Sequence, residues 1–388
     1  MRILVLGGDG YLGWPTAMYF SARGHDVAII DNMIKRYWEA EVGVEPLIPI
    51  RSLKQRVAQW RALTGHSIEV TVADIATNNR QVYNVLERFK PDAIVHYAEQ
   101  PSAPFSMMDR QKCVDTQTNN IAGTINLMFG LRHSCPDAHI VKLGTMGEYG
   151  TPNIDIEEGW IEIEHKGRRD RMLYPKKPGS FYHLSKVADS HNLEFGCRAW
   201  GMRVTDLNQG VVYGIETDEI NLDKDLATSF HYDAIFGTVL NRFITQAVAG
   251  SPLSVYGRGG QTRGFLNIRD TLRCVELAVL NPADAGEFRV FNQFTEQFSV
   301  SQLADAVNRV GNSLGFKTKI EHVPNPRVEA EEHYYNAQHS RLVDLGLQPH
   351  NLTDAVLASM LETVKQNSNR IDTRLFAPDV LWNQRGAS

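Results

Sequence analysis

Apolar and polar residues alternate in blocks along the first half of the chain. Short apolar runs predict buried strands, and the segments between them repeat apolar residues with the period of a helix. The predicted strands lie at residues 2–6, 27–30, 68–72, 93–98, 140–145 and 202–207. The predicted helices lie at residues 51–63, 81–89, 119–131 and 180–199. This order predicts an α/β fold with a mostly parallel sheet wrapped by helices.

Two parts of the chain depart from this pattern. Residues 150–180 are charged and irregular, which fits either a flap over a site or a solvated surface insertion. Beyond residue 214 the alternation becomes irregular, with a helix beginning at Asn241, a short strand at 253–257 and a helix at 353–366. We therefore expect a smaller second domain in the C-terminal part.

The composition narrows the classes of partner. The 388 residues carry a formal charge of −5, without a block of Lys and Arg interleaved with aromatics, which argues against nucleic acid and anionic membranes. No apolar run has membrane-spanning length, so we expect no membrane insertion. The first strand begins almost at Met1, which predicts a cytoplasmic protein, or a chloroplast stromal one if a leader was removed. The four cysteines form no Cys-x-x-Cys pair, and we predict no metal site.

A glycine-rich turn follows the first strand. Its glycines are Gly7, Gly8, Gly10 and Gly13. Such a turn lets a dinucleotide pyrophosphate approach the backbone at a helix N-terminus. Asp31 ends the second strand, where an acid binds the adenosine ribose hydroxyls. Because this carboxylate would repel a ribose phosphate, the sequence favours NAD over NADP, although Lys35 and Arg36 lie nearby.

A tyrosine and a lysine four residues apart supply the candidate chemistry. On a helix, Tyr182 and Lys186 share one face, and the ammonium together with a nicotinamide cation would favour the phenolate. Such a pair can remove a hydroxyl proton while the carbon gives hydride to the cofactor. Alone, the same spacing is also common in structural positions. Thr145, at the end of a predicted strand, would lie beside the cofactor.

Three arginines in the C-terminal part suggest the substrate. Arg242, Arg263 and Arg327 are scattered near glycine or proline turns in an otherwise slightly acidic chain. Guanidinium groups suit a diphosphate, although each alone also fits a surface ion pair. Together they favour a nucleotide-sugar site.

With these motifs, the chain resembles the extended short-chain dehydrogenase/reductase family, which acts on nucleotide sugars. Four longer blocks narrow the resemblance to the branch that makes UDP-sulfoquinovose, the sulfolipid head-group donor, from UDP-glucose and sulfite. The blocks are residues 145–156, 181–186, 206–214 and 325–336. The resemblance implies a Rossmann NAD domain at residues 1–212, to which later segments return, and a UDP-sugar domain at 213–388. It also implies a homodimer formed through the helices near 110–131 and 181–199.

The resemblance assigns roles to individual residues. The expected cofactor-binding residues are Gly7, Gly10, Tyr11, Leu12, Gly13, Asp31, Asn32, Arg36, Asp74, Ile75, Asn119, Tyr182, Lys186 and Val212. The expected substrate-binding residues are Thr145, Gln209, Arg242, Tyr256, Arg263 and Arg327. Oxidation at carbon 4 of the glucose would acidify carbon 5, the 6-hydroxyl would leave, sulfite would add at carbon 6 and the hydride would return.

The elimination step needs a base that differs from that of ordinary 4,6-dehydratases. Those enzymes carry Thr-Asp-Glu where this chain has Thr145-Met146-Gly147. His183 is our candidate base because a histidine titrates near neutrality, although a histidine there can also be a packing group. Glu148 is the second candidate.

The expected sulfite site is where this chain departs from the plant members of the family. Pro101 stands where plant members carry an arginine, and Arg110 is the nearby alternative cation. A sulfite-delivering partner protein is a further expectation. A nucleotide-sugar 4,6-dehydratase or 4-epimerase is the nearest alternative function, and a non-catalytic NAD-binding protein is the other.

Overall fold

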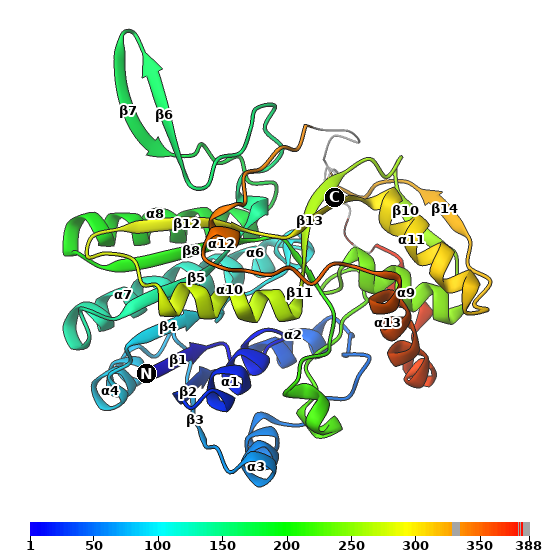
Figure 1. Ribbon diagram of the computed structural model, residues 1–388, viewed down its shortest axis with the longest axis horizontal. Helices are drawn as coiled ribbons and strands as arrows, with labels where there is room; N and C mark the ends of the chain where they lie inside the picture. Colours follow the sequence, from blue (N-terminus) through cyan, green and yellow to red (C-terminus); the bar gives the residue numbers. More distant parts are fainter. Residues whose placement is uncertain (328–333, 379, 381, 383–388) are drawn as a thin grey trace.

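The computed structural model describes residues 1–327, 334–378, 380 and 382, and its centre is a seven-stranded sheet (Figure 1). The strand order is β12-β8-β5-β4-β1-β2-β3, and every neighbouring pair is parallel. The strands are β1 (Arg2–Leu6), β2 (Asp26–Asp31), β3 (Ile68–Val72), β4 (Ala93–His96), β5 (His139–Thr145), β8 (Arg203–Gln209) and β12 (Phe288–Gln293). The predicted α/β fold with a doubly wound parallel sheet is therefore confirmed.

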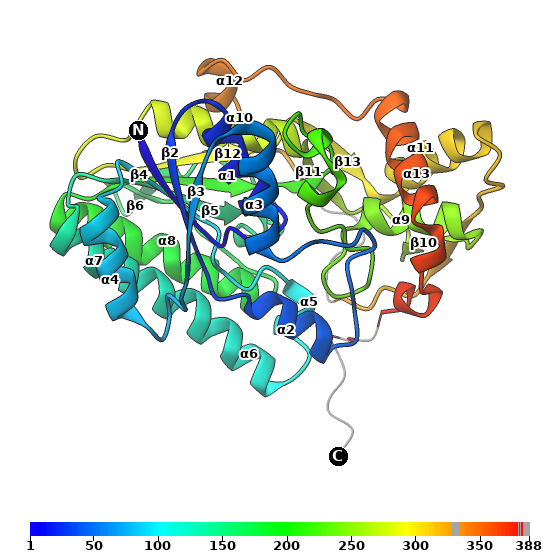
Figure 2. The ribbon, with the colours of Figure 1, turned by 90° about the horizontal axis from the view of Figure 1, so that it is seen from below.

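Helices cover both faces of this sheet, which explains why its strands are apolar along their whole length. Successive residues of a strand point to opposite faces. Ile3 and Val5 of β1 pack toward one face, and Leu4 and Leu6 pack toward the other. The first face is covered by α1 (Gly13–Ala22), α3 (Leu53–Thr64) and α10 (Ile268–Leu280). The second face, opposite α10 in Figure 2, is covered by α4 (Asn79–Phe89), α7 (Gly123–Ser134) and α8 (Phe181–Trp200).

A smaller part lies beside the carboxyl ends of the sheet and has a core of its own. Its helices are α9 (Val239–Ala249), α11 (Val300–Ser313) and α13 (Asp354–Gln366), whereas the short α12 (Arg341–Asp344) that precedes α13 packs on the central sheet through Leu342. Its strands are β9 (Val211–Tyr213), β10 (Leu253–Tyr256), β11 (Thr262–Asn267), β13 (Glu296–Ser299) and β14 (Ile320–Val323). They form one sheet of order β13-β11-β9 and one of order β10-β14. Because β12 comes late in the sequence and pairs with β8, the chain returns to the central sheet after β11.

Several elements differ from the sequence-based expectation. The helix expected at 119–131 is part of a longer run, in which α6 (Arg110–Gln117) and α7 are joined by a π-helical turn at Thr118–Ala122. The helices α2 (Ile34–Glu41) and α5 (Ala103–Ser106) were not expected. Polar residues dominate α6, so its sequence has no apolar period to signal a helix.

The segment 150–180 is not irregular throughout. It contains the antiparallel hairpin β6 (Trp160–His165) and β7 (Arg168–Leu173), which stands away from the body of the molecule in Figure 1. Isoleucine and glutamate alternate along β6, and Glu162 faces Arg171 across the hairpin. This two-residue period was overlooked because charged residues dominate the segment.

The glycine turn after β1 gives a direct test of the packing. A Cβ at Gly13 would collide with the backbone oxygen of Gly7 and lie 2.8 Å from its carbonyl carbon. We expect Gly13→Ala to lower the free energy of unfolding by roughly 1–3 kcal/mol in chemical denaturation, as overpacking does. Gly179→Ala is the matched control, because a Cβ there meets no atom within 4 Å. Equal stability of the two variants would contradict the packing described.

Candidate active site

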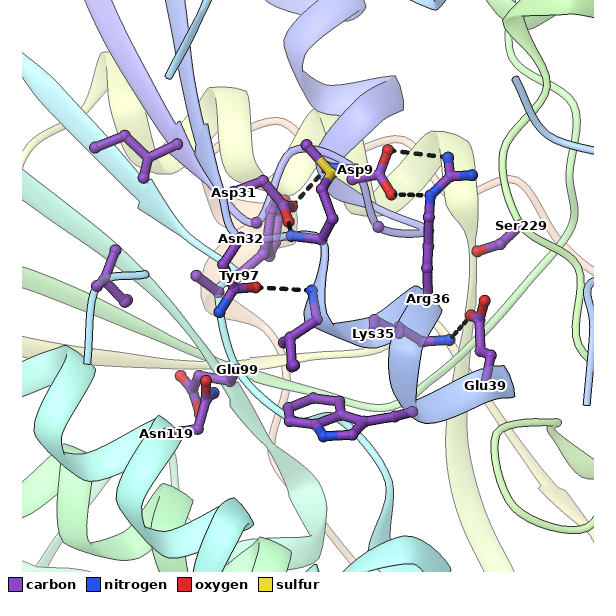
Figure 3. Close-up of a pocket in the computed structure, with 18 of the residues that line it drawn as sticks. Asp9, Asp31, Asn32, Lys35, Arg36, Glu39, Tyr97, Glu99, Asn119 and Ser229 are labelled. Atoms are coloured by element: carbon purple, nitrogen blue, oxygen red, sulfur yellow. Dashed lines mark hydrogen bonds and ion pairs between the residues drawn. The ribbon is translucent and has the colours of Figure 1, made fainter. Parts of the chain in front are cut away.

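A cavity at the carboxyl ends of β1, β2 and β4 contains the glycine turn (Figure 3). Its empty volume is about 680 Å³, including space open to solvent. Gly7 has φ +83°, a conformation that glycine adopts without strain, and its amide donates to Ile30 O at 2.8 Å. Because Gly13 has no side chain, α1 begins directly against this turn. A backbone turn of this kind below a helix N-terminus fits a pyrophosphate.

The far end of the cavity contains the carboxylate of Asp31, and the two cations beside it are paired with other carboxylates. The Asp31 carboxylate accepts hydrogen bonds from the amides of Asp9 (2.8 Å) and Met33 (2.7 Å). Arg36 donates from Nε to Asp9 at 2.6 Å, and Lys35 is paired with Glu39 (Figure 3). Both cations are therefore held by carboxylates of the protein, an arrangement that fits NAD better than a cofactor with a ribose phosphate.

Half of the predicted cofactor-binding residues line this cavity. Those that line the cavity are Gly7, Gly10, Asp31, Asn32, Arg36, Ile75 and Asn119. Asp74 lies behind them and accepts a hydrogen bond from Asn32 at 3.1 Å. Tyr11 and Leu12 pack with Val212 in a separate apolar cluster and do not line the cavity. Sequence reasoning missed Asp9, which holds both Arg36 and the fully buried Arg56.

Tyr182 and Lys186 lie in the first two turns of α8, on one face as the spacing predicted. Ser180 caps this helix by accepting the amide hydrogen of His183. Lys186 Nζ lies 5.9 Å from the centre of the Tyr182 ring. It donates to Leu143 O at 2.6 Å and is 2.7 Å from Glu99 Oε2. The pair thus stands beside the cavity that Glu99 also lines.

The electrostatics of Tyr182 differ from the sequence-based expectation. Burial, followed by the charges of Glu99 and Glu148, raises the pKa of Tyr182 above its usual value. The charge of Lys142 acts in the opposite direction and lowers this pKa, while the ammonium of Lys186 is paired with Glu99. A bound nicotinamide cation would act in the same direction as Lys142 and favour the phenolate.

Below the pair lies a network of buried charges. Lys142 Nζ is 3.2 Å from Glu148 Oε1 and 3.2 Å from Asp206 Oδ2, and it donates to Ser190 Oγ at 2.9 Å. Lys176 pairs with the second oxygen of Glu148. Burial alone would raise the pKa of Glu148, but Lys142 and Lys176 hold it at about 2. The amide of Thr145 donates to Glu148 at 3.2 Å, so this network also fixes the residue that ends β5.

His183 stands at the other side of Tyr182, with ring centres 5.1 Å apart. Its Nδ1 is 3.1 Å from Ser180 Oγ. The imidazole fills the space above Gly147, where a Cβ would collide with Nε2 and lie 2.5 Å from Cδ2. Burial lowers the pKa of His183 to about 4, helped by the charges of Arg327 and Arg263 and opposed by Glu148.

A second cavity is lined almost wholly by residues of the smaller part, with Pro104 of α5 beside them. Its empty volume is about 1120 Å³, including space open to solvent. The predicted substrate residues Arg242, Tyr256, Arg263 and Arg327 all line it. The Arg242 guanidinium stacks 4.3 Å from the centre of the Tyr256 ring. The charges of two of its lining residues, Arg263 and Arg327, act on His183, although His183 itself does not line the cavity.

Gln209 and Gln261 differ from the predicted set of substrate-binding residues. Gln209 donates to Gln293 Oε1 at 3.2 Å inside the core and does not line the second cavity. Gln261 does line it, is 3% exposed, and its amide atoms find no hydrogen-bond partner among the described residues. Such a side chain can bind a polar ligand. Sequence reasoning missed it because no motif marks it.

Other expectations concern metal, membrane and the loop around Pro101. In the part of the chain that the structure describes, no cluster of three or more His, Cys, Asp or Glu side chains could hold a metal ion. None of the helices described combines the length and apolarity that spanning a bilayer requires. Pro101 is exposed, and Arg110 is exposed at the start of α6 and lines neither cavity. Residues 328–333 of the fourth resemblance block lie outside the described residues.

The fold and the two cavities fit an NAD-dependent enzyme of nucleotide sugars. A model of the NAD dependent epimerase/dehydratase family matches residues 3–292, and the chain belongs to this family. It is 54% identical over 385 residues to the chloroplastic UDP-sulfoquinovose synthase of Spinacia oleracea. This match covers 99% of this chain and 80% of the spinach protein. It is 42% identical to the UDP-sulfoquinovose synthase of Sulfolobus acidocaldarius, over 99% of this chain and 98% of that one.

Solved structures show the same fold at lower identity. The UDP-glucuronic acid 4-epimerase of Bacillus cereus, solved with NAD, matches 94% of this chain and 99% of its own, with a TM-score of 0.70 and 19% identity. The UDP-glucose 4-epimerase of Thermotoga maritima gives a TM-score of 0.69 at 18% identity, over 94% and 99% of the two chains. The resemblance noted in the sequence motifs is confirmed, as is NAD as the cofactor.

The Lys142 network yields a stability prediction. Removing one partner of a buried ion pair leaves the others uncompensated, so we expect Lys142→Met to lower the free energy of unfolding by roughly 3–5 kcal/mol at pH 7. Chemical denaturation measures this, and Lys54→Met, at an exposed position of α3, is the control. In the wild type, the stability from ionised Glu148 is complete above the ordinary pKa of 4.5 and is lost as the pH falls through about 2. A Lys142→Met variant as stable as Lys54→Met would refute the role given to the network.

Proposed function

We propose that this protein converts UDP-glucose and sulfite to UDP-sulfoquinovose and water. The observation that carries the proposal is the juxtaposition of the Tyr182–Lys186 pair with His183, which fills the space above Gly147. Two UDP-sulfoquinovose synthases of 54% and 42% identity support the same reading. The arginine-lined cavity offers a site for the UDP-sugar diphosphate, and the charges of its Arg263 and Arg327 act on His183.

The residues of the chain can support each proton movement. When bound, NAD accepts a hydride from carbon 4 of the sugar and later returns it. Tyr182 takes the proton of the 4-hydroxyl and gives it back to the 4-oxygen when the hydride returns, and Thr145 donates a hydrogen bond to the same oxygen. His183 then takes the proton of carbon 5, which the ketone has acidified, and gives it to the departing 6-hydroxyl to form water. Bisulfite adds through sulfur at carbon 6, and its proton passes through His183 to carbon 5.

His183 suits the role of base better than Glu148. With a pKa of about 4, the imidazole is neutral at pH 7 and can accept a proton. Glu148 is held by Lys142, Lys176 and Ser190, and with a pKa of about 2 it is a poor base. We infer that Glu148 positions Thr145 instead. The positive charge of Arg263 and Arg327 near His183 would favour an approaching anion such as sulfite.

We also infer a homodimer through α6, α7 and α8. These helices expose large apolar side chains, which is unusual for surface helices that face solvent. The side chains are Val114, Phe129, Phe181, Leu184 and Phe195. A sulfite-delivering partner protein and the cytoplasmic or stromal compartment stay predictions.

Mass spectrometry of the sugar nucleotide made from UDP-glucose and isotope-labelled sulfite tests the whole pathway. We expect a labelled UDP-sulfoquinovose, and Tyr182→Phe should lower its formation by roughly 10²–10⁴-fold, because the phenol proton acceptor is lost. Tyr37→Phe, which alters a tyrosine 63% exposed, is the control. A 4-keto-6-deoxy sugar or UDP-galactose as the only product would instead favour the dehydratase or epimerase alternative.

A variant of His183 separates oxidation at carbon 4 from the elimination. We expect His183→Asn to retain NADH formation from UDP-glucose within a few-fold, because Tyr182 and Lys186 are unchanged. Deuterium exchange from solvent at carbon 5, followed by NMR, should fall by roughly 10²–10⁴-fold. The exposed His133→Asn is the control. Undiminished exchange in His183→Asn would exclude His183 as the base.

A further inference from the structure

Glu99 lies three residues beyond β4, at the carboxyl edge of the central sheet, and the reaction described above gives it no role. Its side chain is 2% exposed, and Oε2 is 2.7 Å from Lys186 Nζ. It also lines the cofactor cavity, as Figure 3 shows. A buried carboxylate in direct contact with the lysine of the catalytic pair changes the charge that this lysine presents to Tyr182.

The position of Lys186 depends on two contacts that come from neighbouring strands. Leu143 O of β5 accepts a hydrogen bond from Nζ at 2.6 Å, and Glu99 approaches from the end of β4. Lys186 itself is 3% exposed, so water contributes little to its solvation. Without the carboxylate, the carbonyl oxygen would be the single partner that the structure gives this ammonium among the described residues.

The other ionisable groups near this ion pair come from four elements. They are His96 of β4, Lys142 of β5, Glu148 of the turn Met146–Glu148, and Tyr182, His183 and Asp189 of α8. Lys142 and Glu148 already compensate each other. Burial lowers the pKa of His96 to about 4, so this imidazole is neutral at pH 7. Burial, with the charge of Glu99, raises the pKa of Asp189 and favours its uncharged form.

The carboxylate of Glu99 is therefore the group that directly compensates the positive charge of Lys186. We propose that Glu99 is a positioning residue that holds Lys186 between β4 and β5, partly neutralises its charge beside Tyr182, and so sets the pH range in which the pair works. The inference rests on the proposed use of Tyr182 as proton acceptor. It adds a residue outside the Tyr-x-x-x-Lys motif to the control of that step.

The test replaces the carboxylate by an amide of nearly the same shape. In Glu99→Gln the ammonium is no longer neutralised, and a negative charge near the phenol is gone, so both changes favour phenolate. We expect the acid limb of the pH profile for NADH formation from UDP-glucose to move to lower pH by about one unit. Glu99→Asp should return the limb toward the wild-type position, because the charge is restored. An acid limb that stays in place or moves to higher pH in Glu99→Gln would overturn the proposal.

Controls separate this effect from damage to the fold. Glu162→Gln removes the same charge from the exposed hairpin and should leave the limb in place. If Glu99→Gln fails to fold, Glu99→Asp against the wild type decides the question, since its shorter side chain lengthens the ion pair and should give a smaller shift of the same sign. An unchanged limb in that variant would refute the proposal.

A readout that does not depend on turnover completes the test. In protein stripped of NAD, the phenolate absorbance of Tyr182 is the difference between each protein and its Tyr182→Phe counterpart. This difference should appear at lower pH in Glu99→Gln than in the wild type, and coincident titrations would contradict the proposal. Because neither this titration nor NADH formation needs sulfite, both remain valid if the protein fails to make a sulfonated sugar.

Discussion

The geometry of the site depends on the contacts that the buried ammonium of Lys142 makes. It lies on β5 and reaches Glu148 in the following turn, Asp206 on β8, and two groups of α8, Ser190 Oγ and Lys186 O. One buried cation therefore links the strand that ends in Thr145 to the helix that carries Tyr182. Burying a charge is costly unless partners compensate it, and here hydrogen bonds and two carboxylates do so.

The residues of the Lys142 network are distinct from the residues that line the two cavities. The cofactor cavity is built by the carboxyl ends of β1, β2 and β4, whereas the arginine-lined cavity comes largely from the C-terminal part. The candidate catalytic side chains line neither cavity, because they lie at the end of β5 and in the first turns of α8. Loops that bind the nucleotide sugar can thus vary while the distance between Thr145 and the Tyr182–Lys186 pair stays fixed by packed elements.

Patterns in the sequence located those features of the site that depend only on residues close together in the chain. The glycine turn, Asp31 and the Tyr182–Lys186 spacing are each contained within one turn or one helix, so the sequence alone located them. The compensation of Lys186 by Glu99 joins residues 87 positions apart, and no periodicity announces it. The same holds for Asp9, whose pairing with Arg56 depends on how α3 packs against the glycine turn. Helix α6 was missed for a different reason, since its stability comes from packing and capping by Asp109 rather than from an apolar stripe.

Gly147 shows how a missing side chain can move chemistry from one element to another. In ordinary 4,6-dehydratases, the turn after the corresponding strand supplies an acid and a base. Here that turn supplies Met146 and Gly147, and the imidazole of His183 on α8 occupies the space above the glycine. Because His183 is adjacent to Tyr182 and contacts Ser180, which caps the helix, the proposed base and the proposed proton acceptor share one helix. Their separation is then fixed by helical geometry rather than by the conformation of a turn, and the charge of Glu148, which ends that turn, is compensated by Lys142 and Lys176.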